Sequence, residues 1–367
     1  MGILSSIFSF LFFSLWLTPA FGGLFHCHGG GDIPGQCRHK FFHWNQCKPE
    51  RGLTKTEGIS KELLDQFRLM SQYAAAAYWP GNNNSTGTPL SCSGPNCHND
   101  PDGNCPLVEQ AKASTTDEFQ DTPKFDDHGK LTAPLWRMNL IPVKGFIAID
   151  PTNKLVVLSF RGTHSRINWF EDFKLKLRCF DLCDKCAVHT GFSESWLEIR
   201  EAVISNLIAA LATNPDYRVI VTGHSLGAAL ATLAAGDLRK QSEDLKNRTE
   251  LYTFGGPRVG DVETVDFLTK QSNKTYRITN NADIIPQVPG PIIGYMHLSP
   301  EHYIFRNKDD PKPEDVAVLT GYYNREGNTG ADDGFGSMDD HRHYFGYITK
   351  CDPDPPRNLV PPPNKAI

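Results

Sequence analysis

The chain has 367 residues, of which 39% are hydrophobic and 22% are charged, and its formal net charge is -5. This apolar content excludes a disordered chain, and the mild acidity argues against a protein that binds nucleic acid. The length suits one large globular domain or two small ones.

The N-terminal apolar run covers residues 3–17, which is shorter than the roughly 20 residues needed to cross a bilayer. Small residues up to Ala20 and Gly22 follow the run, so we interpret residues 1–20 as a cleaved signal peptide, with an uncleaved anchor as the alternative. The even number of 10 cysteines also suits an oxidising compartment. We therefore predict a secreted, extracellular monomer that has no transmembrane segment after signal cleavage.

Four Asn-X-Ser/Thr sequons are candidates for N-glycosylation in a eukaryotic secretory pathway. They begin at Asn83, Asn84, Asn247 and Asn273. Because Asn83 and Asn84 are adjacent, we do not expect both to carry a glycan.

Residues 21–56 have no hydrophobic period and contain three cysteines and several histidines, which predicts an N-terminal extension to the main domain. Its histidines and cysteines do not have the spacing of a zinc site. Acidic residues near the other end of the chain lack the spacing of an EF-hand and fit a solvated loop. We therefore predict no metal site. The side chains of potential ligand type in these two regions are His26, Cys27, His28, His39, His43, Asp332, Asp333, Asp339 and Asp340.

The main domain is predicted at residues 57–351 and alternates helices with strands, which is typical of an α/β fold. Residues 80–135 are rich in Gly, Asn, Pro and Asp and predict long loops. Residues 352–367 are rich in proline and predict an extended tail. The apolar periods predict helices at 59–74, 194–213 and 228–238, and strands at 145–150, 154–160, 217–222, 251–254 and 276–279.

The most informative motif is Gly-His-Ser-Leu-Gly at residues 223–227. A G-x-S-x-G match alone is weak, but this one follows a predicted strand and begins a predicted helix. That order is typical of the sharp elbow that raises a nucleophilic serine above a sheet edge, and a Cβ at Gly223 or Gly227 would be crowded there. The motif therefore identifies Ser225 as a candidate nucleophile. The alternative is an ordinary glycine-rich loop.

A nucleophilic serine needs a base, and the base needs an orienting carboxylate. In this kind of fold both follow the serine along the chain, and the acid comes first. Asp283 follows a predicted strand directly, so it is the candidate acid, although it also fits a plain turn before a proline. The candidate bases lie further on, and spacing does not choose among His297, His302, His341 and His343.

Several blocks of sequence occur in one order along the domain. They are Gln72–Tyr78, Leu158–Thr163, His189–Phe192, the serine elbow, Thr253–Gly260 and Asp283–Pro286. In these blocks the chain resembles the secreted class 3 lipases of filamentous fungi, which include triacylglycerol lipases and feruloyl esterases. The resemblance adds two further blocks, Gly294–Glu301 and His341–Gly346. The resemblance implies an α/β-hydrolase fold with a central, mostly parallel sheet, helices on both faces and a lid helix.

The resemblance also implies roles for single residues. The family's catalytic histidine stands three residues before Tyr-Phe-Gly, which selects His341. The oxyanion hole would consist of the Leu226 N–H and of Thr163, which otherwise fits a helix cap. The lid would follow Thr163, and it otherwise fits a plain surface helix. Its apolar residues are Ile167, Trp169, Phe170 and Phe173.

The cysteines depart from the family pattern. Most members have a cysteine next to the residue matching Tyr78, paired with the one matching Cys351, but Trp79 occupies that position here. We therefore expect Cys351 to pair with Cys27, Cys37 or Cys47. The family's short bridge is matched by Cys183 and Cys186, whose spacing would also fit a redox pair or half a zinc site. Inspection does not pair the remaining cysteines, which are Cys92, Cys97, Cys105 and Cys179.

These features together predict a secreted serine hydrolase that cleaves acylglycerol esters at a lipid–water interface, without a cofactor. Its partners are the ester lipid and the interface, and no nucleic acid is expected. One alternative is a feruloyl-type esterase that acts on cell-wall phenolic esters. A second alternative is an inactive binding protein on a hydrolase scaffold, in which one catalytic residue would normally be lost.

Overall fold

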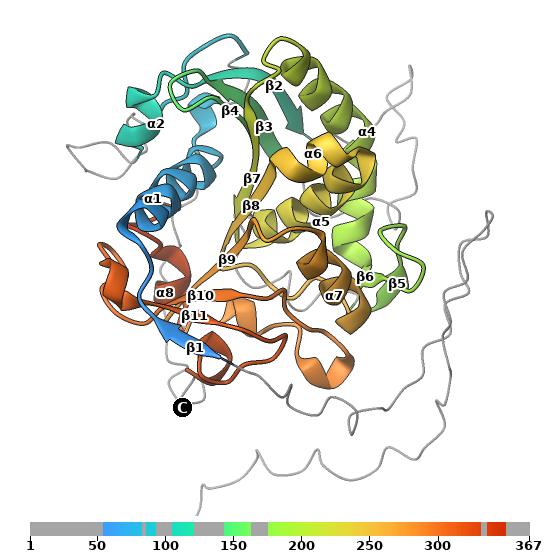
Figure 1. The fold of residues 1–367 in the computed structure, drawn as a ribbon, viewed down its shortest axis with the longest axis vertical. Helices are drawn as coiled ribbons and strands as arrows, with labels where there is room; N and C mark the ends of the chain where they lie inside the picture. Colours follow the sequence, from blue (N-terminus) through green and yellow to red (C-terminus); the bar gives the residue numbers. More distant parts are fainter. Residues whose placement is uncertain are drawn as a thin grey trace, which may run out of the picture. The chain divides into compact units, whose positions relative to one another are not determined.

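The computed structural model describes residues 54–82, 86–92, 105–120, 143–162, 175–331 and 336–349. These residues form part of one compact unit, shown in Figure 1. Several predicted features lie outside the described residues. They are the signal peptide, the extension up to Leu53, the lid, Thr163, Asn83, Asn84, Cys351 and the proline-rich tail.

A nine-stranded sheet crosses the described domain in the order β1-β11-β10-β9-β8-β7-β4-β3-β2. The five central strands, from β4 to β10, are parallel, whereas both edges are antiparallel, so the sheet is mixed. The strands are β1 (Lys55–Glu57), β2 (Ser114–Gln120), β3 (Lys144–Asp150), β4 (Leu155–Phe160), β7 (Arg218–His224), β8 (Thr249–Phe254), β9 (Thr275–Asn280), β10 (Glu301–Ile304) and β11 (Val316–Leu319). A separate hairpin joins β5 (Leu177–Cys179) to β6 (Ala187–His189).

Helices cover both faces of this sheet, with α1 on one face and α4, α5 and α7 on the other (Figure 1). The α-helices are α1 (Lys61–Ala76), α2 (Pro106–Gln110), α4 (Thr190–Ala212), α5 (Leu226–Gln241), α6 (Glu243–Arg248), α7 (Val262–Gln271) and α8 (Met338–Arg342). The short 3-10 turns are η1 (Pro80–Asn82), η3 (Ile285–Gln287), η4 (Pro291–Ile293), η5 (Pro313–Asp315) and η6 (Asn328–Gly330).

The central strand β7 separates two apolar cores. Val219 and Val221 pack in the core that contains α4 and α5, whereas Ile220 packs in the core that contains α1. Successive side chains of a strand point to opposite faces, so a strand with helices on both sides must be apolar throughout. This is why the residues from Val219 to Val221 form a continuous apolar run.

The predicted α/β architecture is confirmed, but the prediction of loops across residues 80–135 was wrong in part. This region contains α2 and the edge strand β2, which pairs antiparallel with β3. The sequence of β2 is Ser-Thr-Thr-Asp-Glu-Phe-Gln, and its register shifts between Thr115 and Asp117. Because β2 is a polar edge strand with a bulge, it lacks the apolar period by which strands are recognised.

Two of the four sequons are within the described residues. Asn247 lies at the end of α6, and Asn273 lies between α7 and β9; both residues are exposed. Lys274 Nζ donates a hydrogen bond to the Asn247 carbonyl at 2.8 Å. The two sequons are therefore neighbours at the amino ends of β8 and β9.

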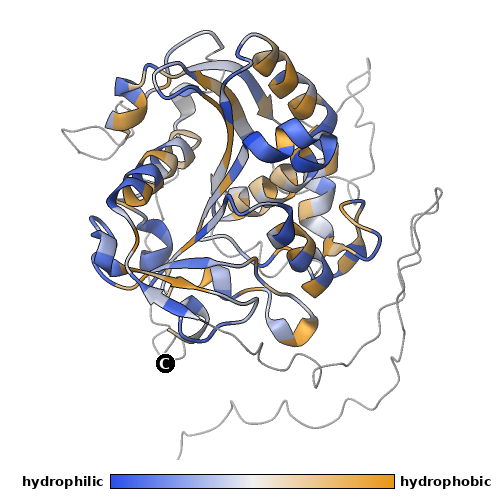
Figure 2. Ribbon diagram, in the orientation of Figure 1, coloured by the Kyte–Doolittle hydropathy of each residue, from blue (hydrophilic) through white to orange (hydrophobic). Residues whose placement is uncertain are grey.

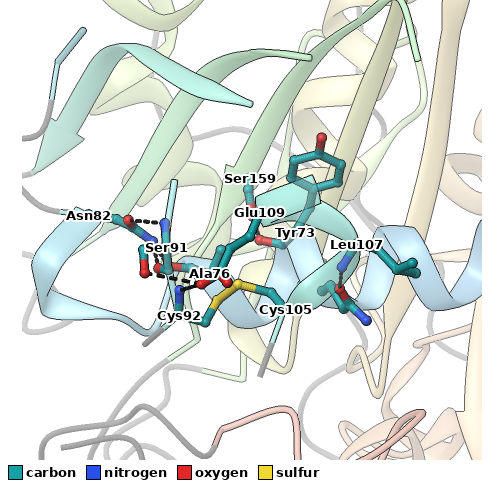
Figure 3. The surroundings of a disulfide bond; sticks show 10 residues. Tyr73, Ala76, Asn82, Ser91, Cys92, Cys105, Leu107, Glu109 and Ser159 are labelled. Atoms are coloured by element: carbon teal, nitrogen blue, oxygen red, sulfur yellow. Dashed lines mark hydrogen bonds between the residues drawn. A yellow bond between two sulfur atoms is a disulfide. The ribbon is translucent and has the colours of Figure 1, made fainter. Parts of the chain in front are cut away.

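Two disulfides connect described cysteines. The predicted Cys183–Cys186 bridge is confirmed, with an S–S distance of 2.02 Å. Cys92 pairs with Cys105 beside α1 and α2, as Figure 3 shows. The Cys92 N–H also donates to Glu109 Oε1 at 3.0 Å. This bridge links Cys92 to the residue that directly precedes α2.

We expect the double substitution Cys92→Ser with Cys105→Ser to destabilise the domain by up to about 3 kcal/mol, because the bridge closes a 13-residue separation in the unfolded chain. Thermal unfolding measures the change. Cys183→Ser with Cys186→Ser is the control, since its separation of 3 residues restricts the unfolded chain less. An equal or larger loss in the control would contradict this account.

Candidate active site

Ser225 lies at the elbow between β7 and α5. Its backbone dihedrals are φ 58° and ψ -128°, a region that non-glycine residues rarely adopt. Its N–H donates to the Phe254 carbonyl at 3.0 Å, which holds the strained turn against β8. Leu226 is the first residue of α5, so its N–H belongs to the group of helix-start donors that have no partner within the helix.

The elbow requires glycine on both sides of the serine. A Cβ added to Gly223 would come within 2.4 Å of the Gly227 carbonyl carbon, and one added to Gly227 would come within 2.2 Å of the Phe160 carbonyl oxygen. These contacts confirm the predicted crowding. Because Gly223 and Gly227 have no side chains, α5 can begin in direct contact with β4 and β7.

Asp283 and His341 form a buried pair. Asp283 follows β9 and is fully buried, and His341 lies in the last turn of α8 with 5% exposure. Nδ1 of His341 is 2.9 Å from Oδ1 and 3.0 Å from Oδ2 of Asp283. Because a carboxylate accepts hydrogen bonds, Nδ1 carries the proton, and Nε2 of the neutral ring is the nitrogen with the free lone pair.

Further donors surround the Asp283 carboxylate. The Ile285 N–H donates to Oδ1 at 2.9 Å, and the Tyr344 hydroxyl donates to Oδ2 at 2.5 Å. Burial, followed by the neighbouring Asp283, raises the pKa of Tyr344 well above its usual value, so this hydroxyl stays protonated. Asn328 Nδ2 donates to the Asp283 main-chain carbonyl at 2.8 Å and fixes the loop that carries the acid.

These residues meet at the carboxyl ends of neighbouring parallel strands. A Cβ added to Gly255, just after β8, would be 2.6 Å from Asp283 Oδ2 and 3.1 Å from His341 Nδ1. One added to Gly162, just after β4, would be 3.1 Å from the Ser225 Cβ. The elbow and the Asp283–His341 pair therefore lie together at the sheet edge formed by the carboxyl ends of the central strands. Thr163, the predicted second oxyanion donor, is outside the described residues.

The other three candidate histidines make different contacts. His297 is buried, and its Nε2 donates to the Pro286 carbonyl at 2.6 Å. Burial lowers the pKa of His302 to about 3, and its ring packs against Phe67 at 5.1 Å between centroids. His343 Nδ1 lies 2.7 Å from the Asp339 carbonyl oxygen. The structure thus brings His341, and none of these three, to Asp283.

Sequence reasoning gave no role to four residues of this site, namely Tyr78, His224, Gly255 and Tyr344. Tyr78, Gly255 and Tyr344 lie within the sequence blocks that carry the family resemblance, and His224 lies within the elbow motif itself. The blocks could have pointed to these positions, but only the fold shows their contacts.

The described residues contain neither a metal-binding cluster nor a membrane-spanning helix. No group of three or more His, Cys, Asp or Glu side chains there is arranged to hold a metal ion. Within the same residues, no helix has both the length and the apolar character required to span a membrane.

We expect Gly255→Ala to destabilise the protein by more than the roughly 1–2 kcal/mol that left-handed backbone costs an L-residue, because φ is 56° and the new Cβ would displace Asp283 and His341. Thermal unfolding measures the loss. Gly87→Ala is the matched control, since its φ is 81° and its Cβ would meet nothing within 4 Å. Equal losses of stability in the two variants would contradict the prediction, because they would mean that the new Cβ at position 255 does not displace Asp283 and His341.

Three comparisons with known proteins agree on a relationship. The family model described as Lipase (class 3) matches residues 157–292. A secreted mono- and diacylglycerol lipase A from Penicillium cyclopium is 35% identical over 303 residues, which are 82% of this chain and 90% of the relative. A secreted mono- and diacylglycerol lipase 1 from Fusarium solani is 34% identical over 246 residues, which are 67% of this chain and 65% of the relative.

Solved structures support the same relationship. The crystal structure of a mono- and diacylglycerol lipase from Aspergillus oryzae has a TM-score of 0.67 and 35% identity, with 80% of this chain and 99% of that chain covered. The similar structures are fungal lipases, so the expected α/β-hydrolase fold is confirmed. The match to the Penicillium relative spans nearly its whole length, and the chain therefore belongs to the class 3 lipase family of carboxylic ester hydrolases.

Proposed function

We propose that this chain is a secreted lipase that hydrolyses acylglycerol esters at a lipid–water interface, with Ser225, His341 and Asp283 as its catalytic triad. The observation that carries the proposal is the buried Asp283–His341 pair at the sheet edge that also holds the strained serine elbow. The curated relatives are named mono- and diacylglycerol lipases, which supports partial glycerides as substrates.

The proposed reaction begins when Ser225 Oγ attacks the ester carbonyl carbon while His341 Nε2 takes its proton. His341 then gives this proton to the departing glycerol oxygen, which leaves an acyl-enzyme that water hydrolyses in the same way. Asp283 holds the Nδ1–H of His341 and stabilises the imidazolium formed at each step. The proton transfers in these steps use the side chains of the triad and water.

The oxyanion of each tetrahedral intermediate needs donors beside Ser225. We assign the Leu226 N–H, which lies at the positive end of α5, as one donor. We assign Thr163 as the other, because its neighbour Gly162 lies beside the Ser225 Cβ. One such donor accounts for roughly 2.7–4 kcal/mol of barrier lowering in a serine hydrolase.

An uncharged segment with an exposed apolar turn supports contact with lipid. Residues 284–300 include no Lys, Arg, Asp or Glu. Within them, the η4 turn exposes 82% of Ile292 and 40% of Ile293, and Figure 2 shows apolar residues at a protruding turn there. Leu175 is also 49% exposed, and its near neighbour Leu177 lies 3.6 Å from a Cβ built on Gly294.

This apolar turn belongs to the same sheet edge as the candidate site. It follows Asp283 in the chain, and the Met296 N–H donates to the Gly260 carbonyl in the loop that leaves β8. The turn would therefore enter a lipid surface on the side from which substrate reaches Ser225. A net charge of -5 favours uncharged acylglycerol surfaces over anionic ones.

We expect Ser225→Ala to abolish ester hydrolysis and covalent labelling by an organophosphate, because only a residual rate of roughly 10³–10⁴-fold over water survives loss of a triad member. His341→Ala should lose activity to a similar extent, whereas His343→Ala should lose far less. Initial rates on a p-nitrophenyl ester measure both. Labelling of another serine, or the opposite order of the two histidines, would contradict the triad.

Replacing Ile292 and Ile293 by Ser should reduce binding to a neutral diacylglycerol emulsion by about tenfold or more, since each buried Ile side chain contributes roughly 1.5–3 kcal/mol. The two substitutions are made in a Ser225→Ala background, so that the substrate is not hydrolysed. The fraction of protein that floats with the emulsion then measures binding. Ile208→Ser on α4, where Ile208 is 47% exposed, is the matched control. Unchanged flotation, or a preference of the active enzyme for soluble methyl ferulate, would contradict an interfacial lipase.

A further inference from the structure

His224 joins the nucleophile elbow to the proposed base through its own ring. It is 1% exposed and directly precedes Ser225. Its Nδ1 is 2.8 Å from the Tyr78 hydroxyl, and its Nε2 is 2.7 Å from the main-chain carbonyl oxygen of His341. The rings of His224 and His341 lie 4.5 Å apart between centroids.

These contacts determine the protonation of His224. A carbonyl oxygen only accepts hydrogen bonds, so Nε2 carries the proton, and the Nε2–H donates a hydrogen bond to the main-chain carbonyl oxygen of His341. Nδ1 is then an acceptor, and the Tyr78 hydroxyl donates to it. Burial, followed by the charge of nearby His341, lowers the pKa of His224 well below its usual value. The ring therefore stays neutral beside the imidazolium that forms on His341 during turnover.

The His341 backbone needs an external contact of this kind. It lies in α8, which has only 5 residues and provides few hydrogen bonds of its own. Asn280 Nδ2 donates to the Asp340 carbonyl at 3.0 Å and holds the preceding peptide. At His341 itself, the His224 Nε2–H satisfies the carbonyl and ties it to the end of β7.

Tyr78 connects the same network to α1 and to the oxyanion side of the site. It is 2% exposed just beyond the end of α1, and its N–H donates to the Ala75 carbonyl at 2.9 Å. A Cβ built on Gly162 would be only 2.1 Å from the Tyr78 hydroxyl. The tyrosine therefore approaches the segment that leads to Thr163 while it orients the His224 ring.

We propose that His224 is a positioning residue, whose neutral Nε2–H fixes the His341 main chain at a set distance from Ser225, and that Tyr78 fixes the tautomer which makes this possible. The inference rests on the triad proposed above. His224 does not touch substrate in this account. Its contribution appears in the chemical step, because a displacement of about 1 Å at a reacting group can cost on the order of 100-fold in rate.

Two substitutions of His224 separate positioning from packing. The amide of Gln reaches the place of Nε2 and still donates to the His341 carbonyl, whereas the amide of Asn reaches only the place of Nδ1 and keeps the Tyr78 contact. We expect His224→Gln to keep kcat within about fivefold of the native enzyme, and His224→Asn to lose about 10- to 100-fold in kcat with KM changed less than twofold.

Rates on a soluble p-nitrophenyl ester, together with thermal unfolding, provide the readout. Tyr78→Phe removes the donor to Nδ1 without removing the ring, so kcat should fall to a value between those of the two His224 variants. The same substitution keeps the test decisive if His224→Asn does not fold. His302→Gln and His302→Asn are the matched controls, because His302 is also buried at 4% exposure and contacts neither Ser225 nor His341 in any described hydrogen bond.

The inference would be overturned if Gln and Asn at position 224 reduced kcat equally, if Tyr78→Phe left kcat unchanged, or if the His302 variants gave the same kcat losses. Failure of the underlying triad is recognised separately. If Ser225→Ala kept its activity, the triad would be wrong whatever the His224 variants do. If Ser225→Ala were inactive and the His224 variants kept kcat, only the positioning role would fail.

Discussion

The contact between the start of α5 and strands β4 and β7 is the constraint on which the rest of the site depends. It requires glycine at position 227, because a Cβ atom there would lie 2.2 Å from the Phe160 carbonyl oxygen. This close approach forces Ser225 into its rare left-handed conformation and places the first peptide of α5 beside it. Strain at one residue is tolerated because the apolar cores on both faces of β7 fix the elements that meet there.

A second constraint follows from burying a carboxylate. Asp283 is fully buried, and such a group is costly to desolvate unless hydrogen bonds replace its water. The ring of His341, the Ile285 N–H and the Tyr344 hydroxyl supply those bonds. The same donors fix the direction of both carboxylate oxygens, so the ion that orients His341 has little freedom to turn away. The same hydrogen bonds therefore solvate the Asp283 carboxylate and orient the His341 ring.

Much of this arrangement follows from local sequence, and the rest depends on contacts between distant residues. The apolar runs of β3, β4 and β7 and the glycines of the elbow carry local signals, so the α/β alternation and the place of Ser225 could be predicted. Asp283 could be ranked because it follows a strand. No local signal distinguishes His341 from His343, and only the family resemblance did so. The strand β2, the Cys92–Cys105 bridge and the contact from Tyr78 to His224 depend on pairing across the fold, which composition and period do not encode.

The parallel centre of the sheet has a consequence for the two described sequons. Parallel strands have all their amino ends at one edge, and Asn247 and Asn273 are exposed there, at the edge opposite Ser225. A sugar chain at either residue would point into water when the opposite edge rests on an oil droplet. The side of the molecule that carries the sequons would then be hydrated by its glycans, while the opposite side stays in contact with the lipid droplet. A glycan at Asn247 or Asn273 would then separate neighbouring adsorbed molecules without covering the side of the enzyme that faces the droplet.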